Sequence, residues 1–148
     1  MALAANDAAD RVDQLIILTE RLTEVVAKQC QSFEGHRPQD AASLMEEANR
    51  LANLYRHEST RVRADPSLVM SAPPEIRQQL IQATEAFDAV LARHGRAVMA
   101  AKFVTEGLVR AIAEEVASQR DSLSSYGPGA RQPSSATGAT AITLNQKA

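Results

Sequence analysis

The sequence predicts an all-α protein with three antiparallel helices, the last of them long, and a disordered tail. Along three segments, apolar residues recur at alternating steps of three and four, which is the spacing of one helix face. The composition also favours helices over sheets, because Ala, Leu and Val dominate the apolar residues and aromatic residues make up only 3% of the chain. At 148 residues the chain has the size of a single domain.

The first helix is expected over about residues 7–33. Its stripe consists of Val12, Leu15, Thr19, Leu22, Val26, Gln29 and Phe33. Gly35 and Pro38 then predict a turn, because glycine readily adopts left-handed backbone dihedrals and the residue before a proline avoids the helical region. The single cysteine, Cys30, excludes an intrachain disulfide and is expected to be a small core residue.

The second helix is expected over about residues 38–63. Its stripe consists of Ala41, Leu44, Ala48, Leu51, Tyr55 and Val62. Its charged residues, Glu58 among them, alternate in sign at helical spacing and are interpreted as a solvated outer face. Three prolines in the connector over 65–74 exclude a regular helix throughout, and Leu68, Val69 and Met70 are expected to pack against the end of the bundle.

The third helix is expected over about residues 74–120. Its stripe consists of Ile76, Leu80, Thr84, Phe87, Leu91, His94, Val98, Ala101, Thr105, Leu108, Ile112 and Val116. At 1.5 Å per residue it is roughly 70 Å long, whereas the first two helices reach only about 35 to 40 Å. A break at Gly95 would instead fold the chain into a four-helix bundle. The uninterrupted register through Gly95 favours the continuous helix.

The difference in length predicts a surface for another protein. The first two helices can cover only the first half of the third, although its second half remains apolar. We therefore expect residues 1–122 to form one helical domain, 123–148 to be a flexible tail, and a partner to cover the uncovered half. The predicted partner-binding residues are Val98, Ala101, Phe103, Val104, Leu108, Val109, Ile112, Val116 and, as a supplementary contact, Tyr126.

No motif for chemistry accompanies this pattern. His36, His57 and His94 lack paired-ligand spacing, and no nucleophile or phosphate-binding motif occurs, so neither an enzyme, a metal nor a cofactor is expected. The net charge of −2 argues against nucleic acid as a partner. The start of the chain lacks a signal-peptide pattern and no apolar stretch is long enough to insert into a membrane, so a cytoplasmic location is expected.

Several segments resemble the FlgN-like family of flagellar type III export chaperones, including its alphaproteobacterial flagellar assembly members. They are DRVDQLIILTERLTEVV in the first helix, VRAIAEEVASQRDSL at the end of the last, SSYGPGA at the start of the tail and ITLNQKA at its end. The resemblance implies a cytoplasmic chaperone that binds hook-filament junction proteins before export and delivers them to the export apparatus. The alternative is a structural or regulatory homodimer in flagellar assembly, which would use the same surface.

Overall fold

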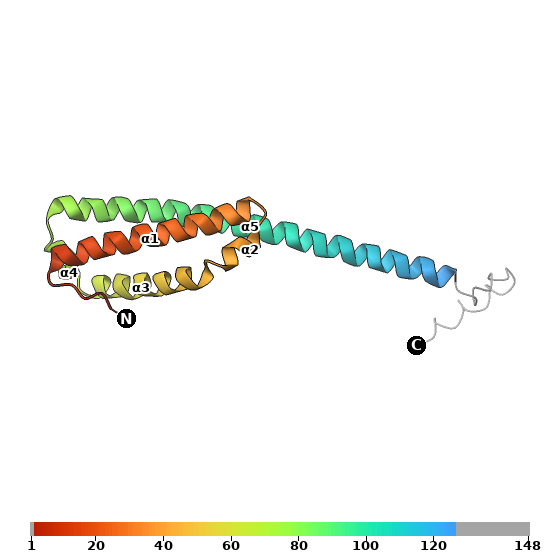
Figure 1. Cartoon of the computed structure of the whole chain (residues 1–148), viewed down its shortest axis with the longest axis horizontal. Helices are drawn as coiled ribbons and strands as arrows, with labels where there is room; N and C mark the ends of the chain where they lie inside the picture. The colour runs from red at the N-terminus through yellow and green to blue at the C-terminus, as the bar shows by residue number, and fades with distance from the viewer. Residues whose placement is uncertain (1, 127–148) are drawn as a thin grey trace, which may run out of the picture. The chain divides into compact units, whose positions relative to one another are not determined.

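The structure, a computed structural model, describes residues 2–126 and is built of helices alone within that range (Figure 1). The elements in chain order are α1 (Ala8–Glu34), α2 (Pro38–Ala42), α3 (Met45–Ala64), α4 (Ser67–Met70) and α5 (Pro74–Ser125). The predicted all-α class is confirmed. The helix α5 runs through Gly95 without a break, so the alternative of a fourth helix starting there does not occur.

The chain divides into two compact units, whose described parts are residues 2–105 and 106–126. The expected tail, residues 123–148, lies mostly outside the described residues. Its first part differs from the expectation, because α5 continues to Ser125 and not only to about Arg120. Ser122, Ser124 and Ser125 each donate a hydroxyl hydrogen bond to a carbonyl three residues earlier, which accommodates a serine-rich sequence in the last turns. The single domain over 1–122 stays a prediction.

The core of the first unit lies between α1, α3 and the beginning of α5. Leu22 and Val26 of α1 contact Phe87 of α5, and the rings of Tyr55 and Phe87 lie 5.2 Å apart. Ion pairs at the edges join α1 to its two neighbours. Arg21 pairs with Glu47 and Arg11 with Glu58, so α1 runs antiparallel to α3. The end of α1 pairs with Arg93, whereas Ile16 lies beside Gln79, so α1 runs parallel to the first part of α5.

The turn after α1 differs in detail from the prediction. The Gly35 amide still donates to the Gln31 carbonyl at 2.9 Å, so Gly35 completes the last helical turn with a φ of −81°. The left-handed conformation therefore falls on the next residue, His36, whose φ is 56°. The Arg37 amide then donates to the Ser32 carbonyl at 2.8 Å, which closes the turn.

The predicted helix over 38–63 is wrong as a single element, because the chain turns at Ser43 and Leu44 between α2 and α3. In a continuous helix the Asp40 carbonyl would accept from the Leu44 amide. Here that carbonyl accepts from the Ser43 hydroxyl at 2.8 Å, and the Leu44 amide donates to Ala41 instead. A serine hydroxyl that competes for a backbone carbonyl is a known cause of such a break.

Two further expectations about side chains are corrected. Glu58, expected on the solvated face of the second helix, is fully buried and pairs with Arg11 of α1 at 3.0 Å. A buried carboxylate requires such a partner, and sequence spacing within one helix cannot reveal a partner 47 residues away. In the connector, Leu68 and Val69 are half-buried, but Met70 is exposed because α4 turns it outward, toward Arg77.

Candidate partner-binding surface

The inward face of α5 in the first unit is set by its neighbours α1 and α3. Phe87 and Ala97 are buried, and Val90 and His94 are half-buried. Leu91, which the sequence placed in the stripe, is 47% exposed. In this part of α5 the buried side faces the end of α1, because Phe33 and Glu34 of α1 contact His94 and Arg93 there.

The predicted residues of the first unit, which lie between positions 98 and 105, form one candidate surface. Val98 and Ala101 are half-buried, whereas Val104 is 59% exposed. A hollow of about 210 Å³ opens beside them, between the end of α1 and α5. Its lining consists of Phe33, Glu34, His36, Ala97, Ala100, Ala101 and Val104. Sequence reasoning missed Phe33 as a partner of Ala101 and Val104, because no periodicity within one helix reports a contact with another.

Polar groups at the rim of this hollow are fixed by local partners. Arg93 donates from Nε to the Glu34 carboxylate at 2.8 Å, and this hydrogen bond lowers the pKa of Glu34. The ring of His94 meets Phe33 edge-on, with the centroids 5.8 Å apart. Burial lowers the pKa of His94, so its ring is neutral near pH 7. The rim thus adds little net charge to an apolar hollow.

Phe103 does not belong to the same face as the other predicted residues. At about 100° per residue, it lies roughly 160° around α5 from the buried Phe87. It is 78% exposed beside the exposed Met99, on the far side of the helix from the core. Its apolar, aromatic side chain favours a contact with a partner, but its angular position separates it from the other predicted residues.

The second unit carries the rest of the predicted residues on the helix over 106–125, where every side chain is exposed. Leu108, Val109, Ile112 and Val116 recur at steps of one, three and four, as one broad helix face requires. Leu123, seven residues after Val116, continues this face and was missed by the prediction. We call Leu108, Val109, Ile112, Val116 and Leu123 the apolar strip. Tyr126, at the end of the helix, is also exposed.

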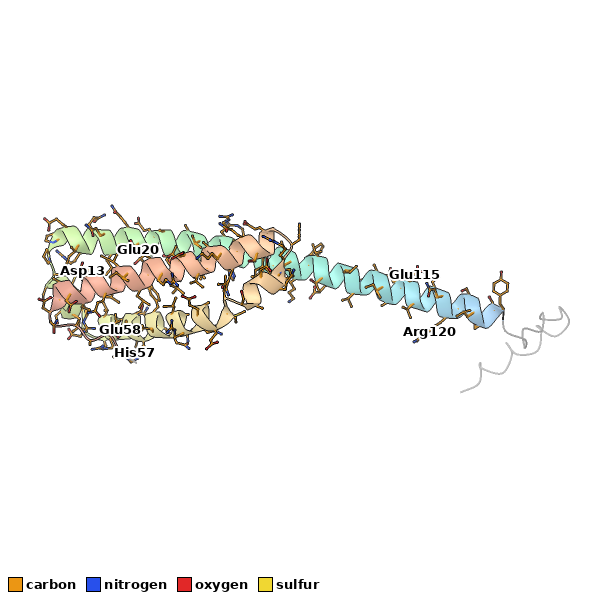
Figure 2. All side chains as sticks on the ribbon, viewed as in Figure 1. Asp13, Glu20, His57, Glu58, Glu115 and Arg120 are labelled. Carbon is orange, nitrogen blue, oxygen red and sulfur yellow. The ribbon has the colours of Figure 1, made fainter. Side chains whose placement is uncertain are left out.

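Charged residues border the apolar strip and occupy other sides of this helix segment. Arg110, Glu114, Glu115, Arg120 and Asp121 lie outside the apolar strip, and Figure 2 labels Glu115 and Arg120 among them. The Glu115 carboxylate, at the border of the strip, accepts from the Gln119 amide at 2.9 Å, so Gln119 places one polar group within the face of the strip. A helix with one apolar and one charged side can pair with another helix through its apolar side.

The described residues show neither a metal site nor a membrane-spanning helix. Among residues 2–126, no three side chains of the His, Cys, Asp or Glu type lie close enough to hold a metal ion together. No helix within the same range is both long and apolar enough to cross a membrane. Burial raises the pKa of the Cys30 thiol, and so favours its protonated, unreactive form. The hollow of the first unit and the apolar strip of the second are two separate candidate surfaces.

Comparison with known proteins gives one close relative. The chain is 62% identical over 149 aligned residues to the flagellar basal-body protein FlbY of Caulobacter vibrioides, and the alignment covers 100% of both chains. No protein-family model matches the chain, and no solved structure does. The likeness therefore extends over the whole length, including the apolar strip and the residues after it.

Proposed function

The chain belongs to the FlbY family of flagellar basal-body proteins, and we propose that it acts in flagellar assembly as a cytoplasmic chaperone. Its substrates would be the hook-filament junction proteins, held before their export by the type III apparatus. The resemblance to FlgN-like export chaperones supports this role, as does a flagellar relative that matches from end to end. Delivery would involve components of the export apparatus.

The exposed apolar strip is the observation that carries the proposal. Leu108, Val109 and Ile112 are each between 55% and 62% exposed, and Leu123 is 73% exposed. Full burial of one such side chain contributes about 1.5 to 3 kcal/mol, so a partner that covers the strip gains stability. A large apolar surface that is rimmed by charged residues is typical of a protein-binding site.

The partner segment is proposed to be an amphipathic helix. The strip recurs at helical steps over several turns, and a helix with the same spacing matches it residue by residue. The resemblance to FlgN-like chaperones implies substrates with helical terminal segments, which fits this mode of binding. In the first unit, the hollow beside Phe33, Ala101 and Val104 would accept a large apolar side chain of the substrate.

A pull-down with a purified hook-filament junction protein tests the proposal. Leu108→Asp and Ile112→Asp each place a charge in the strip, and we expect roughly a 10- to 100-fold loss of affinity from each. Helical circular dichroism should hardly change, because both side chains are already exposed. Phe103→Asp is the matched control, since it introduces the same charge on the other side of α5. Normal binding by both strip variants would show that the substrate binds elsewhere.

The alternative is a structural or regulatory homodimer, in which the strips of two copies cover each other. It rests on the same exposed residues and on the continuous helical spacing of the strip. Light scattering of the purified protein over a range of dilutions separates the two functions. A monomer supports the chaperone, whereas a dimer that persists on dilution and is broken by Ile112→Asp supports self-assembly.

A further inference from the structure

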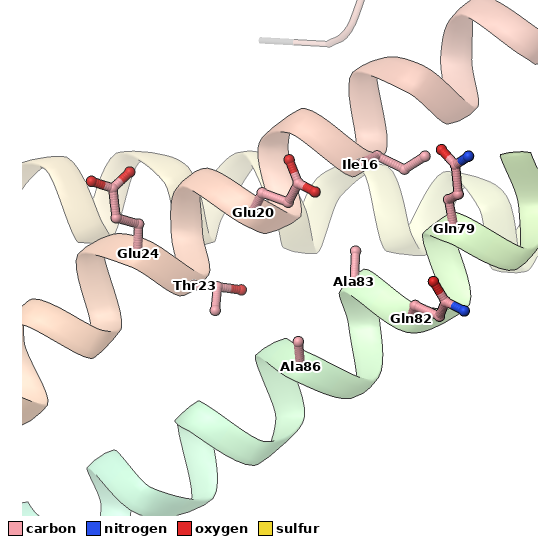
Figure 3. A pocket seen from close by; sticks show the side chains of 8 residues that line it. All are labelled: Ile16, Glu20, Thr23, Glu24, Gln79, Gln82, Ala83 and Ala86. Atoms are coloured by element: carbon pink, nitrogen blue, oxygen red, sulfur yellow. The ribbon is translucent and has the colours of Figure 1, made fainter.

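A second surface lies in the first unit, in the groove between α1 and the early part of α5. The groove has a volume of about 580 Å³, and four side chains from each helix line it (Figure 3). They are Ile16, Glu20, Thr23 and Glu24 of α1, and Gln79, Gln82, Ala83 and Ala86 of α5. None of the eight belongs to the hollow or to the apolar strip, so this groove is a separate surface.

The floor of the groove consists of short side chains. Figure 3 shows Ala83 and Ala86 directed toward α1, with Thr23 facing the gap from the other helix. Small residues let the backbone of a further helix come close to both walls, within the usual 8 to 10 Å between packed helix axes. The lining residues recur at steps of one, three and four on α1 and of one and three on α5, so the groove follows both helices. A helix laid in it would complete a four-helix arrangement.

The α1 wall gives the groove one unpaired negative charge, that of Glu20. Among its lining residues Glu20 and Glu24 are the charged ones, and both lie on the α1 wall. Lys28 and Arg21 pair with Glu24, at 2.7 and 3.3 Å. Glu20 has no hydrogen bond or ion pair with any side chain of residues 2–126. Its carboxylate is therefore a free charge beside an apolar floor.

A second copy of this chain is a poor occupant for the groove. A two-fold contact through this face would place Glu20 of one copy near Glu20 of the other, and like charges at an interface are unfavourable. Asp13 lies seven residues before Glu20 on the same side of α1 and would add to the repulsion (Figure 2). The complementary occupant carries positive charge.

We propose that the groove binds a cationic amphipathic helix of another protein. Small or aliphatic residues of that helix lie against Ala83 and Ala86, and a Lys or Arg on its flank pairs with Glu20. The opposite flank is polar, since the amides of Gln79 and Gln82 both donate and accept hydrogen bonds. This surface would let the chain hold one protein at the groove while the apolar strip holds another.

Nuclear magnetic resonance of the ¹⁵N-labelled full chain tests the groove with synthetic peptides. The probe is an amphipathic helical peptide of Ala, Leu and Lys with the lysines along one flank, and its control has Glu in place of every Lys. We expect the lysine peptide to shift the side-chain amide signals of Gln79 and Gln82, and the glutamate peptide to leave them unchanged. Shifts confined to the apolar strip would overturn the assignment.

Matched variants separate the groove from general charge effects. Glu20→Lys should weaken binding of the lysine peptide about tenfold, whereas Glu46→Lys, an equal charge change at an exposed position of α3, should not. Ala86→Arg should block the groove, whereas Ala92→Arg on an outer side of α5 should leave binding intact. Equal losses from Glu20→Lys and Glu46→Lys would overturn the proposal, as would normal binding by Ala86→Arg.

Two further outcomes would assign the groove to a different occupant and so overturn the proposal. If the Gln79 and Gln82 signals shift with protein concentration in the absence of peptide, the occupant of the groove is a second copy of the chain. Gln79 and Gln82 signals that shift when Arg131→Glu and Lys147→Glu are introduced together would indicate that the chain's own C-terminal residues occupy the groove. Neither outcome bears on the substrate pull-down, because the strip variants and the groove variants share no residue.

Discussion

At the scale of single residues, Glu58 joins three parts of the first unit through one buried carboxylate. It accepts hydrogen bonds from the Leu3 amide at 2.9 Å, from Arg11 at 3.0 Å and from Arg61 at 3.1 Å. Removing one partner of a buried ion pair leaves the other charge uncompensated. We expect Glu58→Gln to lower the free energy of unfolding by about 3 to 5 kcal/mol, measured by urea denaturation. The exposed control Glu46→Gln should change it by less than about 0.5 kcal/mol. Equal losses of stability from the two variants would mean that the Glu58–Arg11 ion pair is exposed to solvent.

His94 makes the stability of the first unit depend on pH. Its Nε2 atom is buried without a hydrogen-bond partner, and burial lowers its pKa below the ordinary value of 6.5. The unfolded chain therefore binds a proton more readily, so stability is complete above about pH 6.5 and falls as the pH drops through the lowered folded-state pKa. Glu24 and Glu34 have lowered pKa values and stay charged over this range.

The test compares urea denaturation at about pH 7 and pH 5. His94→Leu should remove most of the pH dependence, because no group remains there to take up the proton. His57→Leu is the control, since His57 is exposed, and it should keep the wild-type dependence. If the His94→Leu protein kept the wild-type pH dependence of stability, that dependence would belong to other titratable groups.

At the scale of the helices, periodicity located the elements well and their interruptions poorly. The expected range 7–33 agrees with α1 to within one residue at each end, and the start of α5 at Pro74 was also predicted. The break between α2 and α3 was missed, because it depends on one Ser43 hydroxyl bond and not on Gly or Pro. Among the predicted partner-binding residues, helical spacing places Leu108 and Ile112 on one face, whereas Phe103 lies on another side of α5, and all three stay predictions.

The continuity of α5 through Gly95 leads to a prediction about that glycine. Nothing lies within 4 Å of the position that an added Cβ would take, and the backbone is helical. Gly95→Ala should therefore raise the free energy of unfolding by about 1 kcal/mol, as urea denaturation would report. Gly35→Ala is the contrasting variant, because its Cβ would lie 3.1 Å from the Gln31 carbonyl oxygen, so its gain should be smaller. A destabilised Gly95→Ala protein would mean that α5 bends there in solution.

At the scale of the whole molecule, the two units are stabilised in different ways. In residues 2–105 the helices bury one another, with Val12, Val25 and Cys30 almost fully inaccessible. In residues 106–125 every side chain is exposed, so backbone hydrogen bonds and local pairs alone support the helix. An isolated helix of such a length is only marginally stable in water. Sequence patterns revealed this unpaired apolar side, but they could not say which molecule covers it, because that information lies in the partner.

Amide hydrogen exchange of the free, full-length protein should therefore separate the two units. We expect the amides of 108–125 to exchange many-fold faster than those around Leu22 and Val25, because marginal helices open readily and buried ones do not. Addition of a hook-filament junction protein should slow exchange over 108–125, and Ile112→Asp should abolish that protection. If these amides are already protected without a partner and lose protection on dilution, two copies of the chain cover each other and the homodimer is the correct function. Protection that survives dilution in a monomer would instead mean that the strip is covered within one chain, and neither function would then use it.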